Sequence, residues 1–324
     1  MVPAAAAVAL LAGWMATVAT PTPLETSTQP TSEIHATTPT HPTEPTPASL
    51  TPAATPAALP GPTEVAFITD YGNCDEGARD VADMVDSWQV DAVMTGGDNT
   101  QGETACRAYT QSVPPYYGKY SSDHDRPRLF PALGNHDYDN ETAGLAAYTR
   151  AFPYLPTDAD PHGRWYEKTI GDITFFVLDT ESRPGDQRAQ QDWLEEAMST
   201  SRSEHPDMWR VVIAHRPPYS SGVHGPWPAM QPDAGWALGD WGADLVLSGH
   251  QHVYEDVVVD GLHHITGTTG AGKTVRECGD PVEGSRVCVE GAGALRIEAT
   301  ATRLTVELHH PADETAKDRV TLTR

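Results

Sequence analysis

The sequence predicts an α/β fold in which strands alternate with helices around a mostly parallel sheet. Five short apolar runs have the length and composition of buried strands, and the segments between them carry helical patterns. Each run ends abruptly in a residue that can bind a metal ion. Because parallel strands place their carboxyl ends at one edge of a sheet, the five ends predict one cluster of ligands along that edge.

The polar ends of the five runs supply a mixed set of oxygen and nitrogen ligands. The runs span residues 65–69, 91–95, 129–133, 210–214 and 245–249. The candidate ligands that follow them are Asp70, Asp98, Asn135, His215, His250 and His252. Carboxylate, amide and imidazole groups suit Fe, Mn or Zn better than Ca²⁺, and six ligands are too many for one tetrahedral ion. The set therefore predicts two ions that share a bridging carboxylate.

The stretch Gly134-Asn135-His136-Asp137 is the most informative of these ends, although a Gly-Asn turn with an incidental His would explain it in isolation. Its recurrence with four similar ends favours a site. In this order, the motifs around Asp70, Asp98, Asn135, His215 and His250 resemble those of calcineurin-like metallophosphoesterases. The segments 215–220 and 249–255 resemble the purple acid phosphatase branch, which includes tartrate-resistant acid phosphatases.

The resemblance covers about residues 64–310 and implies a fold as well as a site. The implied fold is a four-layer α/β/β/α sandwich of two mixed β-sheets flanked by helices. In the implied site, Asp98 bridges the two ions and Asp70 and His252 hold the first ion. Asn135, His215 and His250 hold the second ion. His136 and His224 are the implied catalytic residues, facing the phosphoryl group or the leaving oxygen.

One position departs from the purple enzymes, and it leaves the identity of the metals open. Gln101 stands where those enzymes have a Tyr that binds Fe(III), and Gly72 does not supply the His that the non-purple branch uses. Gln101, another side chain or water would complete the first ion's ligands. We therefore expect a non-purple protein that binds two divalent or trivalent ions, with Fe, Zn and Mn as candidates.

The expected function is that of a secreted phosphatase that hydrolyses phosphate monoesters with a metal-activated water. The motif residues determine metal chemistry and not the leaving group, so a phosphodiesterase or nucleotidase on the same centre is an alternative. A second alternative is a cell-surface metal-binding protein with impaired turnover, which Gln101 and a long Thr/Pro-rich stretch would suit.

Composition divides the chain into three parts. Residues 1–19 contain an apolar run that resembles a signal peptide, although no Lys or Arg precedes Arg79, and a retained anchor is the alternative. Residues 20–62 are rich in Thr and Pro and poor in bulky apolar residues, which predicts a disordered linker. Residues 63–324 form the predicted catalytic domain, which is long enough for a substantial core.

The net charge and the cysteine content limit which partners and which cellular compartment are expected. The net charge of −24 argues against a nucleic-acid-binding surface and against stable association with anionic membranes. A small phosphate ester is the expected partner, and the oligomeric state is not predicted. Four cysteines in an exported chain favour disulfides, and proximity suggests Cys74–Cys106 and Cys278–Cys288 among three possible pairings. Four reduced cysteines are the alternative.

Hydrophobic patterns predict the remaining elements. Helices are expected over residues 76–88, 141–151 and 187–199, and strands over 165–170, 173–178, 254–259, 263–266, 295–299 and 304–309. A long loop is expected from residue 99 to residue 126, and a Pro- and Gly-rich loop that contains His224 from residue 216 to residue 232. His263-His264 and His309-His310 lie outside the motifs and are predicted to be ordinary strand and terminal residues.

Overall fold

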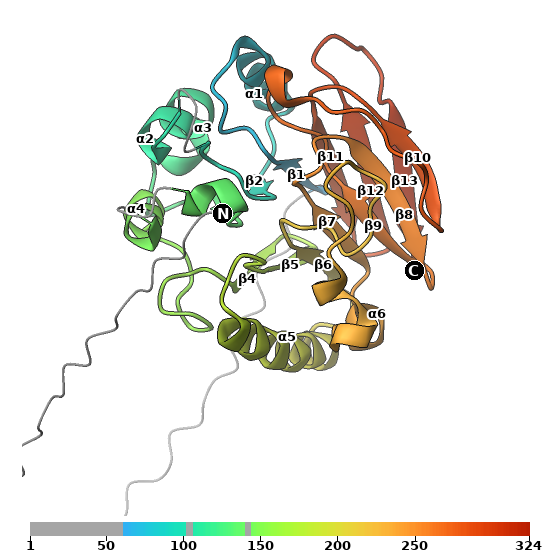
Figure 1. The fold of residues 1–324 in the computed structure, drawn as a ribbon. Coiled ribbons are helices and arrows are strands. Elements are labelled where there is room, and N and C mark those ends of the chain that lie inside the picture. The colour runs from blue at the N-terminus through green and yellow to red at the C-terminus, as the bar shows by residue number, and fades with distance from the viewer. Residues whose placement is uncertain (1–60, 102–105, 140–143) are drawn as a thin grey trace, which may run out of the picture. The chain divides into compact units, whose positions relative to one another are not determined.

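A computed structural model describes residues 61–101, 106–139 and 144–324 of the chain. The predicted signal-like segment, 1–19, and nearly all of the predicted linker lie outside these residues. None of the helices in the described ranges combines the length and the apolar character that crossing a bilayer requires. The described residues form two β-sheets with helices on either side (Figure 1).

The first sheet carries three of the five predicted motif strands. Its order is β13-β12-β11-β1-β2-β3, in which β1, β2 and β3 are parallel and the other neighbours are antiparallel. The strands are β1 (Thr63–Ile68), β2 (Ala92–Thr95), β3 (Leu129–Pro131), β11 (Ala294–Thr300), β12 (Arg303–His309) and β13 (Asp318–Thr323).

The second sheet carries the other two motif strands, β6 and β7. Its order is β10-β8-β9-β7-β6-β5-β4, and β5, β6, β7 and β9 are parallel. The strands are β4 (Tyr166–Ile170), β5 (Ile173–Val177), β6 (Trp209–Ile213), β7 (Leu245–Ser248), β8 (Tyr254–Val259), β9 (Leu262–Thr266) and β10 (Ser285–Val289).

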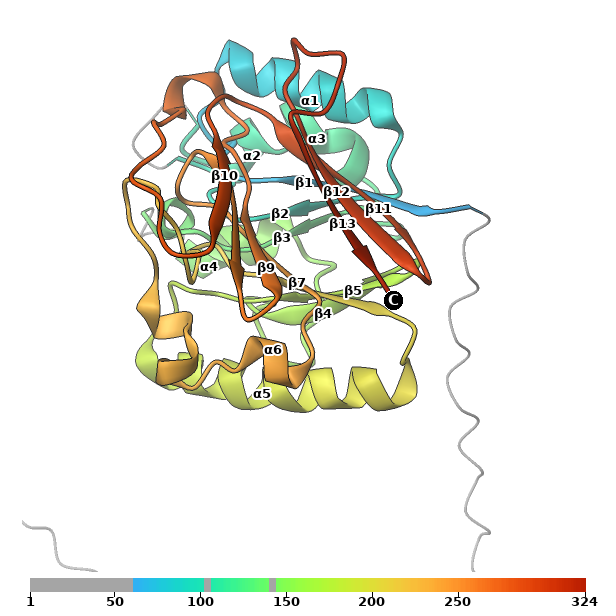
Figure 2. The same ribbon diagram turned by 90° about the vertical axis from the view of Figure 1, so that its right-hand side faces the viewer.

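The helices form the outer layers beside these sheets. Helices α1 (Glu76–Trp88), α2 (Tyr109–Ser112), α3 (Pro114–Ser121) and α4 (Gly144–Ala151) lie beside the first sheet. Helices α5 (Pro184–Glu204) and α6 (Leu238–Trp241) lie beside the second sheet (Figure 2). The expected sandwich of two mixed sheets flanked by helices is therefore confirmed. The single, mostly parallel sheet expected from the apolar runs alone is wrong, because apolar runs identify strands but do not encode which strands pair.

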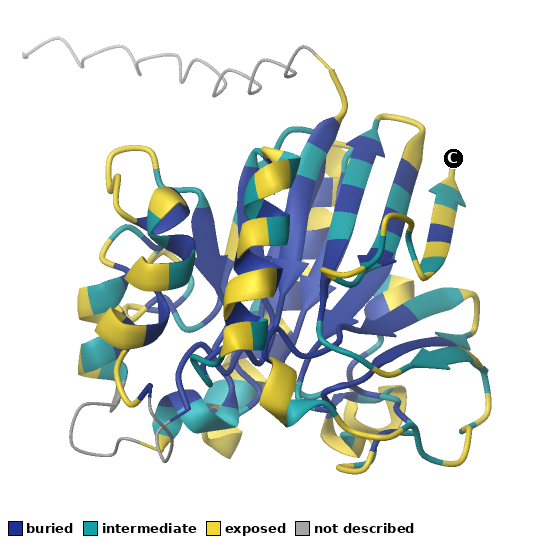
Figure 3. Ribbon diagram, turned by 90° about the horizontal axis from the view of Figure 1, so that it is seen from above, coloured by how far each residue is buried: buried dark blue, intermediate teal, exposed yellow. Residues whose placement is uncertain are grey.

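Two sets of buried side chains hold the layers together. Val81, Ala82 and Val85 of α1 join the larger core cluster, which includes residues of both sheets. Leu194 and Met198 of α5 pack in a second cluster against residues of β5, β6 and β7. The central strands of both sheets are accordingly buried, whereas the outward face of α1 is exposed (Figure 3). Burial of a Val or Leu side chain stabilises the fold by about 1.5–3 kcal/mol each.

Most predicted elements are confirmed, with differences at their ends. Helix 76–88 matches α1 at both bounds, and α5 is longer than the predicted helix 187–199. The start of predicted helix 141–151 lies outside the described residues, and its remainder matches α4. The predicted loop 99–126 is wrong over residues 109–121, where α2 and α3 form. The adjacent Pro114 and Pro115 begin α3, because proline is well tolerated in the first turn of a helix.

The cysteines pair as proximity in sequence suggested. Cys74 bonds to Cys106, and Cys278 bonds to Cys288, so the alternative of four reduced cysteines is wrong. The first bond ties the segment between β1 and α1 to the segment that precedes α2. The second closes a loop beside β10.

Candidate metal centre

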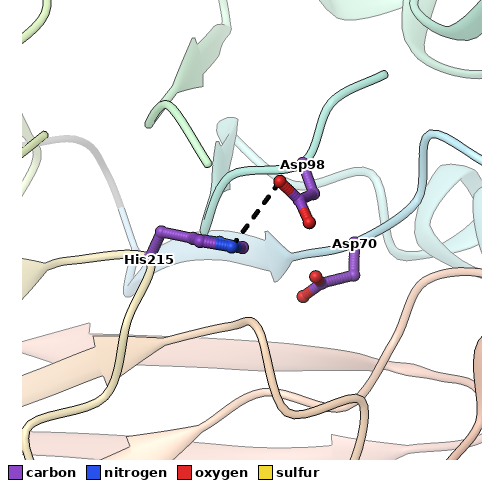
Figure 4. Close-up of side chains that lie close together, drawn as sticks. All are labelled: Asp70, Asp98 and His215. Carbon is purple, nitrogen blue, oxygen red and sulfur yellow. Dashed lines mark ion pairs between the residues drawn. The ribbon is translucent and has the colours of Figure 1, made fainter. Parts of the chain in front are cut away.

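Three predicted ligands meet at the carboxyl ends of strands from both sheets. Asp70 follows β1, Asp98 follows β2, and His215 follows β6. One ligand atom from each lies within 4.8 Å of the other two, and all three residues are buried. Figure 4 shows the contact between Nε2 of His215 and Oδ1 of Asp98 (3.5 Å) as a dashed line, with Asp70 beside them. The division of the strands between two sheets therefore does not separate the predicted ligands.

Tight backbone turns deliver these side chains directly from the strand ends. Asp70 and Asp98 have positive φ angles of 55° and 53°, a conformation that Asp tolerates better than most residues. Gly97 has a φ of 94°, and a Cβ atom there would lie 2.6 Å from Nδ1 of His215. Glycine is required at residue 97 because the two strand ends approach so closely.

Asp70 is held on one side and faces the cluster on the other. Its Oδ2 accepts hydrogen bonds from Thr69 Oγ1 (2.6 Å) and from the backbone N–H of His250 (2.9 Å). Its Oδ1 lies 3.1 Å from Nε2 of His252. Burial disfavours the charged carboxylate, but the neighbouring His252 and His215 lower the pKa of Asp70 below its usual value. The group is therefore an anion at neutral pH.

Asp98 lies beside Asp70 in the same buried site. Its Oδ1 accepts a hydrogen bond from the backbone N–H of His136 (2.9 Å) and lies 3.5 Å from Nε2 of His215. Burial, together with the charges of Asp70 and Asp137, raises the pKa of Asp98 well above its usual value. Two buried carboxylates that are both charged repel each other. A metal ion bound between them would offset this repulsion.

His215 and His252 are both oriented by a backbone carbonyl group. Nδ1 of His215 donates to the oxygen of Gly96 (2.7 Å), and Nδ1 of His252 donates to the oxygen of Thr274 (2.7 Å). In the neutral ring, each Nε2 then keeps its lone pair and lies next to Asp98 and Asp70 respectively. This arrangement is usual for metal-binding histidines, because the second hydrogen bond fixes the tautomer and the ring orientation. Against the effect of burial, Asp70 raises the pKa of His252, so a proton competes with a metal ion for this nitrogen.

Asn135 and His250 also reach the cluster, but they are engaged differently. Oδ1 of Asn135 lies 3.2 Å from Nε2 of His215. The ring of His250 lies 5.0 Å from that of His215, yet its Nε2 lies 3.0 Å from a guanidinium nitrogen of Arg216. Burial, together with His215 and Arg216, lowers the pKa of His250 to about 2. His250 is therefore a neutral imidazole whose Nε2 contacts an arginine.

The two predicted catalytic histidines lie next to different members of the cluster. Nε2 of His136 is 4.0 Å from Oδ2 of Asp98, and its Nδ1 contacts Asp139 at 2.5 Å. The ring of His224 is 4.7 Å from that of His250 and 6.3 Å from that of His252. Its backbone N–H donates to the side chain of Gln251 (3.0 Å), which fixes the loop beside the ligands.

Gln101, at the departure from the purple enzymes, is a buried residue of the same region. Its backbone N–H donates to the oxygen of Cys106 (3.0 Å), which is disulfide-bonded to Cys74.

A buried hydrogen-bond network supports the site and was not foreseen. The side-chain amide of Asn99 donates to Asp137 Oδ2 (2.9 Å) and to the oxygen of Ala132 (2.7 Å). Asp137 also accepts from the backbone N–H of Gly134 (2.9 Å), and burial raises its pKa to about 6. Both residues belong to the motifs. The network ties the turn after β2 to the turn after β3.

A second unforeseen group extends from the end of β5. Glu181 accepts hydrogen bonds from Arg216 at 2.6 and 3.0 Å, and Asp179 accepts one from Tyr138 (2.6 Å). Burial raises the pKa of Asp179 to about 7. A signal for this group exists in the sequence, because the apolar run of β5 ends in polar residues as the five motif runs do.

Comparison with known proteins identifies the family. The model of the calcineurin-like phosphoesterase family matches residues 63–254, which is more than half of the chain. The chain belongs to this family. The match spans the five motifs, so it includes Asp70, Asp98, Asn135, His215, His250 and His252.

Solved structures share the fold of this calcineurin-like phosphoesterase at low sequence identity. GAP50, the anchor in the inner membrane complex of Plasmodium, superposes with a TM-score of 0.64 and 16% identity, covering 81% of this chain and 89% of GAP50. Purple acid phosphatase PPD1 from yellow lupin gives 0.65 and 17%, covering 82% of this chain and 54% of the lupin chain. A dimetal phosphatase from Danio rerio gives 0.56 and 14%, covering 81% and 99%.

The donor chemistry of the cluster fits divalent metal ions. Buried carboxylate oxygens and imidazole nitrogens with fixed tautomers suit Zn, Mn or Fe. Asp70, Asp98, His215 and His252 meet this requirement. His250 meets it less well because its Nε2 contacts Arg216.

Proposed function

We propose that this calcineurin-like phosphoesterase is a secreted phosphatase that hydrolyses phosphate monoesters with water at a centre of two metal ions. The observation that carries the proposal is the convergence of buried Asp70, Asp98 and His215 within 4.8 Å. Two neighbouring buried carboxylates are costly to keep charged, and bound cations would offset that cost. Such a pair of ions activates water and stabilises the attacking and leaving oxygens of a displacement at phosphorus.

The proposed roles are those that the resemblance to the family implies. Asp98 would bridge the ions, Asp70 and His252 would hold the first, and Asn135, His215 and His250 would hold the second. His136 is suited to the reacting phosphate because its Nε2 lies 4.0 Å from Asp98 and its side chain is 35% exposed. Its Nδ1 contacts Asp139, which would orient the ring toward the phosphoryl or leaving oxygen. His224 would face the substrate from beside His250 and His252.

The compartment and the division of the chain are part of the same proposal. Two disulfides among the described residues are typical of extracellular proteins. We propose that residues 1–19 direct export, that residues 20–62 form a linker, and that residues 63–324 form the catalytic domain.

The test is metal analysis of protein purified without added ions, combined with assays of an aryl phosphate monoester and diester. About two equivalents of Fe, Zn or Mn with preferential monoester turnover is the expected result. Diester turnover would replace the monoester assignment while retaining the centre. Bound metal without hydrolysis of either ester would instead support a non-catalytic, metal-binding protein and would refute the enzymatic proposal.

A further inference from the structure

Arg216 lies beside the proposed ligands, and its contact with His250 determines which ring nitrogen of His250 carries a proton. A guanidinium group has N–H donors and no acceptor, so in the 3.0 Å contact the nitrogen of Arg216 donates and Nε2 of His250 accepts. A neutral imidazole that accepts at Nε2 carries its proton on Nδ1. Neither nitrogen of His250 then has a lone pair free for a metal ion.

The guanidinium group is held in this position by three further contacts. Nε of Arg216 donates to Oε1 of Glu181 (2.6 Å), and a terminal nitrogen donates to Oε2 (3.0 Å). This forked pairing is geometrically specific and is stronger than a single hydrogen bond. The guanidinium carbon also lies 4.7 Å from the ring centroid of Trp227, within the range of a cation–π contact. Arg216 is therefore a fixed positive charge and not a mobile surface side chain.

Glu181 is itself anchored, so the arrangement does not depend on Arg216 alone. Its backbone N–H donates to Oδ1 of Asp179 (3.0 Å), and its Oε1 accepts a hydrogen bond from Thr180 Oγ1 (3.1 Å). The side chain of Glu181 is 14% exposed and that of Arg216 is 21% exposed. The pair is thus largely shielded from water, where its attraction is weakened little by salt.

We infer that Arg216 competes with a metal ion for His250, and that the protein binds its two ions with unequal affinity. This inference rests on the proposed two-ion centre. The first ion binds to ligands that already face the cluster, on Asp70, Asp98 and His252. The second ion requires a lone pair of His250. An ion at Nε2 would displace the hydrogen bond from Arg216, and an ion at Nδ1 would leave the ring proton on Nε2, which could then no longer accept from Arg216. In either case Arg216 must first withdraw its hydrogen bond and move its charge away.

The test is calorimetric titration of the full chain, stripped of metal with a chelator, with Zn²⁺ or Mn²⁺ alone. Arg216→Met removes the charge and the donor but keeps an unbranched stem against Trp227. The expected result is that this variant binds the second ion about tenfold or more tightly than the wild type, the scale of changes beside metal ligands. The first ion should bind with unchanged affinity.

Two further variants make the result specific. Glu181→Gln combined with Arg216→Met must retain the gain, because the carboxylate freed in the single variant could otherwise become a new ligand. Arg296→Met is the matched control, since Arg296 pairs with Glu64 at 2.6 and 2.8 Å outside the site. It should leave both affinities unchanged. A gain that disappears in the double variant, or that also appears in the control, would overturn the inference.

The remaining outcomes separate this inference from the proposed function. Second-ion affinity that is unchanged or weaker in folded Arg216→Met protein would overturn the competition while leaving the two-ion centre intact. A chain that binds no divalent ion in any form would overturn both. A measurement on the wild type covers the case in which the variants do not fold. In the ion-free protein, ¹⁵N NMR of the His250 ring should show the proton on Nδ1, and a proton on Nε2 would refute the contact.

Discussion

At the scale of single residues, Asp98 is the carboxylate on which the proposed centre most depends. It is buried and lies within reach of both His215 and His136. Asp98→Asn removes the negative charge while preserving size. Substitution of a residue that only hydrogen-bonds to a metal ligand lowers metal affinity by up to about 100-fold, and loss of the bridging carboxylate should lower it further. Calorimetric titration measures this, with Asp256→Asn, a buried carboxylate paired with His263 outside the site, as the control. Near-normal affinity in Asp98→Asn would refute the bridging role.

His136 leads to a contrasting prediction, because its backbone N–H contacts Asp98 whereas its side chain is proposed to contact the substrate. The backbone N–H, which donates to Asp98, is retained in His136→Ala. Metal content should therefore be unchanged, whereas kcat for an aryl phosphate monoester should fall about 100-fold or more, as expected for loss of a proton donor. Exposed His162→Ala is the control. Loss of bound metal in His136→Ala would make His136 a ligand instead.

The buried His264 on β9 leads to a prediction of how the free energy of unfolding changes at low pH. It is buried, its Nδ1 has no hydrogen-bond partner among the described residues, and its ring packs against Tyr219 with centroids 4.8 Å apart. Burial, with His263 nearby, lowers its pKa from 6.5 to about 4. The unfolded chain therefore takes up the proton first, so this contribution to stability is complete above pH 6.5 and is lost as the pH falls toward 4.

The variant His264→Phe isolates that contribution, because it keeps an aromatic ring and cannot take up a proton. Relative to this variant, the wild type should lose up to about 3 kcal/mol in free energy of unfolding between pH 7 and pH 4. Urea denaturation at several pH values measures the difference, with exposed His162→Phe as the comparison. Parallel pH profiles for the wild type and His264→Phe would show that His264 is not buried as a neutral ring.

At the scale of elements, the start of α1 is joined to the turn that orients His252. Asp75 caps α1 by accepting from the backbone N–H of Ala78 (2.9 Å). It also accepts from the backbone N–H groups of Gly272 (3.1 Å) and Lys273 (2.7 Å), in the short 3-10 turn Gly272–Thr274. The carbonyl of Thr274 in turn accepts from His252. One carboxylate thus connects a helix end to a proposed ligand.

Loss of an N-cap usually costs about 1 kcal/mol. Asp75→Ala should lower the free energy of unfolding by at least this amount, because the hydrogen bonds to the turn are lost as well. Urea denaturation measures the change. Asp83→Ala, on the exposed face of the same helix, should change stability by less than about 0.5 kcal/mol. Equal effects of the two substitutions would mean that Asp75 does not act as a cap.

The elements also show how far sequence reasoning extends. The strand ends that carry the proposed ligands were predictable because an apolar run followed by Asp or His is a local signal. The division of those strands between two sheets was not predictable from the runs, since pairing depends on contacts between distant segments. Strand β10, with no fully buried residue, and the weakly apolar β13 gave little signal. The contact of Glu181 with Arg216 joins residues 35 positions apart, and no spacing rule indicates it.

At the scale of the whole folded part, the two sheets meet so that the strand ends with the proposed ligands share one edge. Thr69 at the end of β1 forms an isolated parallel bridge with Thr269, just beyond β9. Toward the other ends of the strands, Nε1 of Trp209 on β6 donates to the oxygen of Thr300 on β11 (2.7 Å). These contacts tie the first sheet to the second at both edges. The site is therefore a property of the packing of the sheets and not of either sheet alone.

The net charge of −24 makes a prediction for the molecule as a whole. A negative surface repels a phosphate dianion and lowers its concentration near the site, and salt screens that repulsion. The value of kcat/KM for an aryl phosphate monoester should therefore rise about threefold or more as ionic strength increases from about 10 mM to about 200 mM. The increase should be steeper for a substrate that carries a second phosphate group.

Steady-state kinetics in two inert salts would separate screening from specific ion effects, because screening depends on ionic strength and not on the identity of the salt. A phosphate diester, with one negative charge, is the matched substrate if it is turned over, and its salt dependence should be shallower. A fall in kcat/KM with rising salt would mean that the local field of Arg216 and Arg276, which both act on His224, outweighs the total charge. Substrate would then be attracted by the site despite an acidic surface.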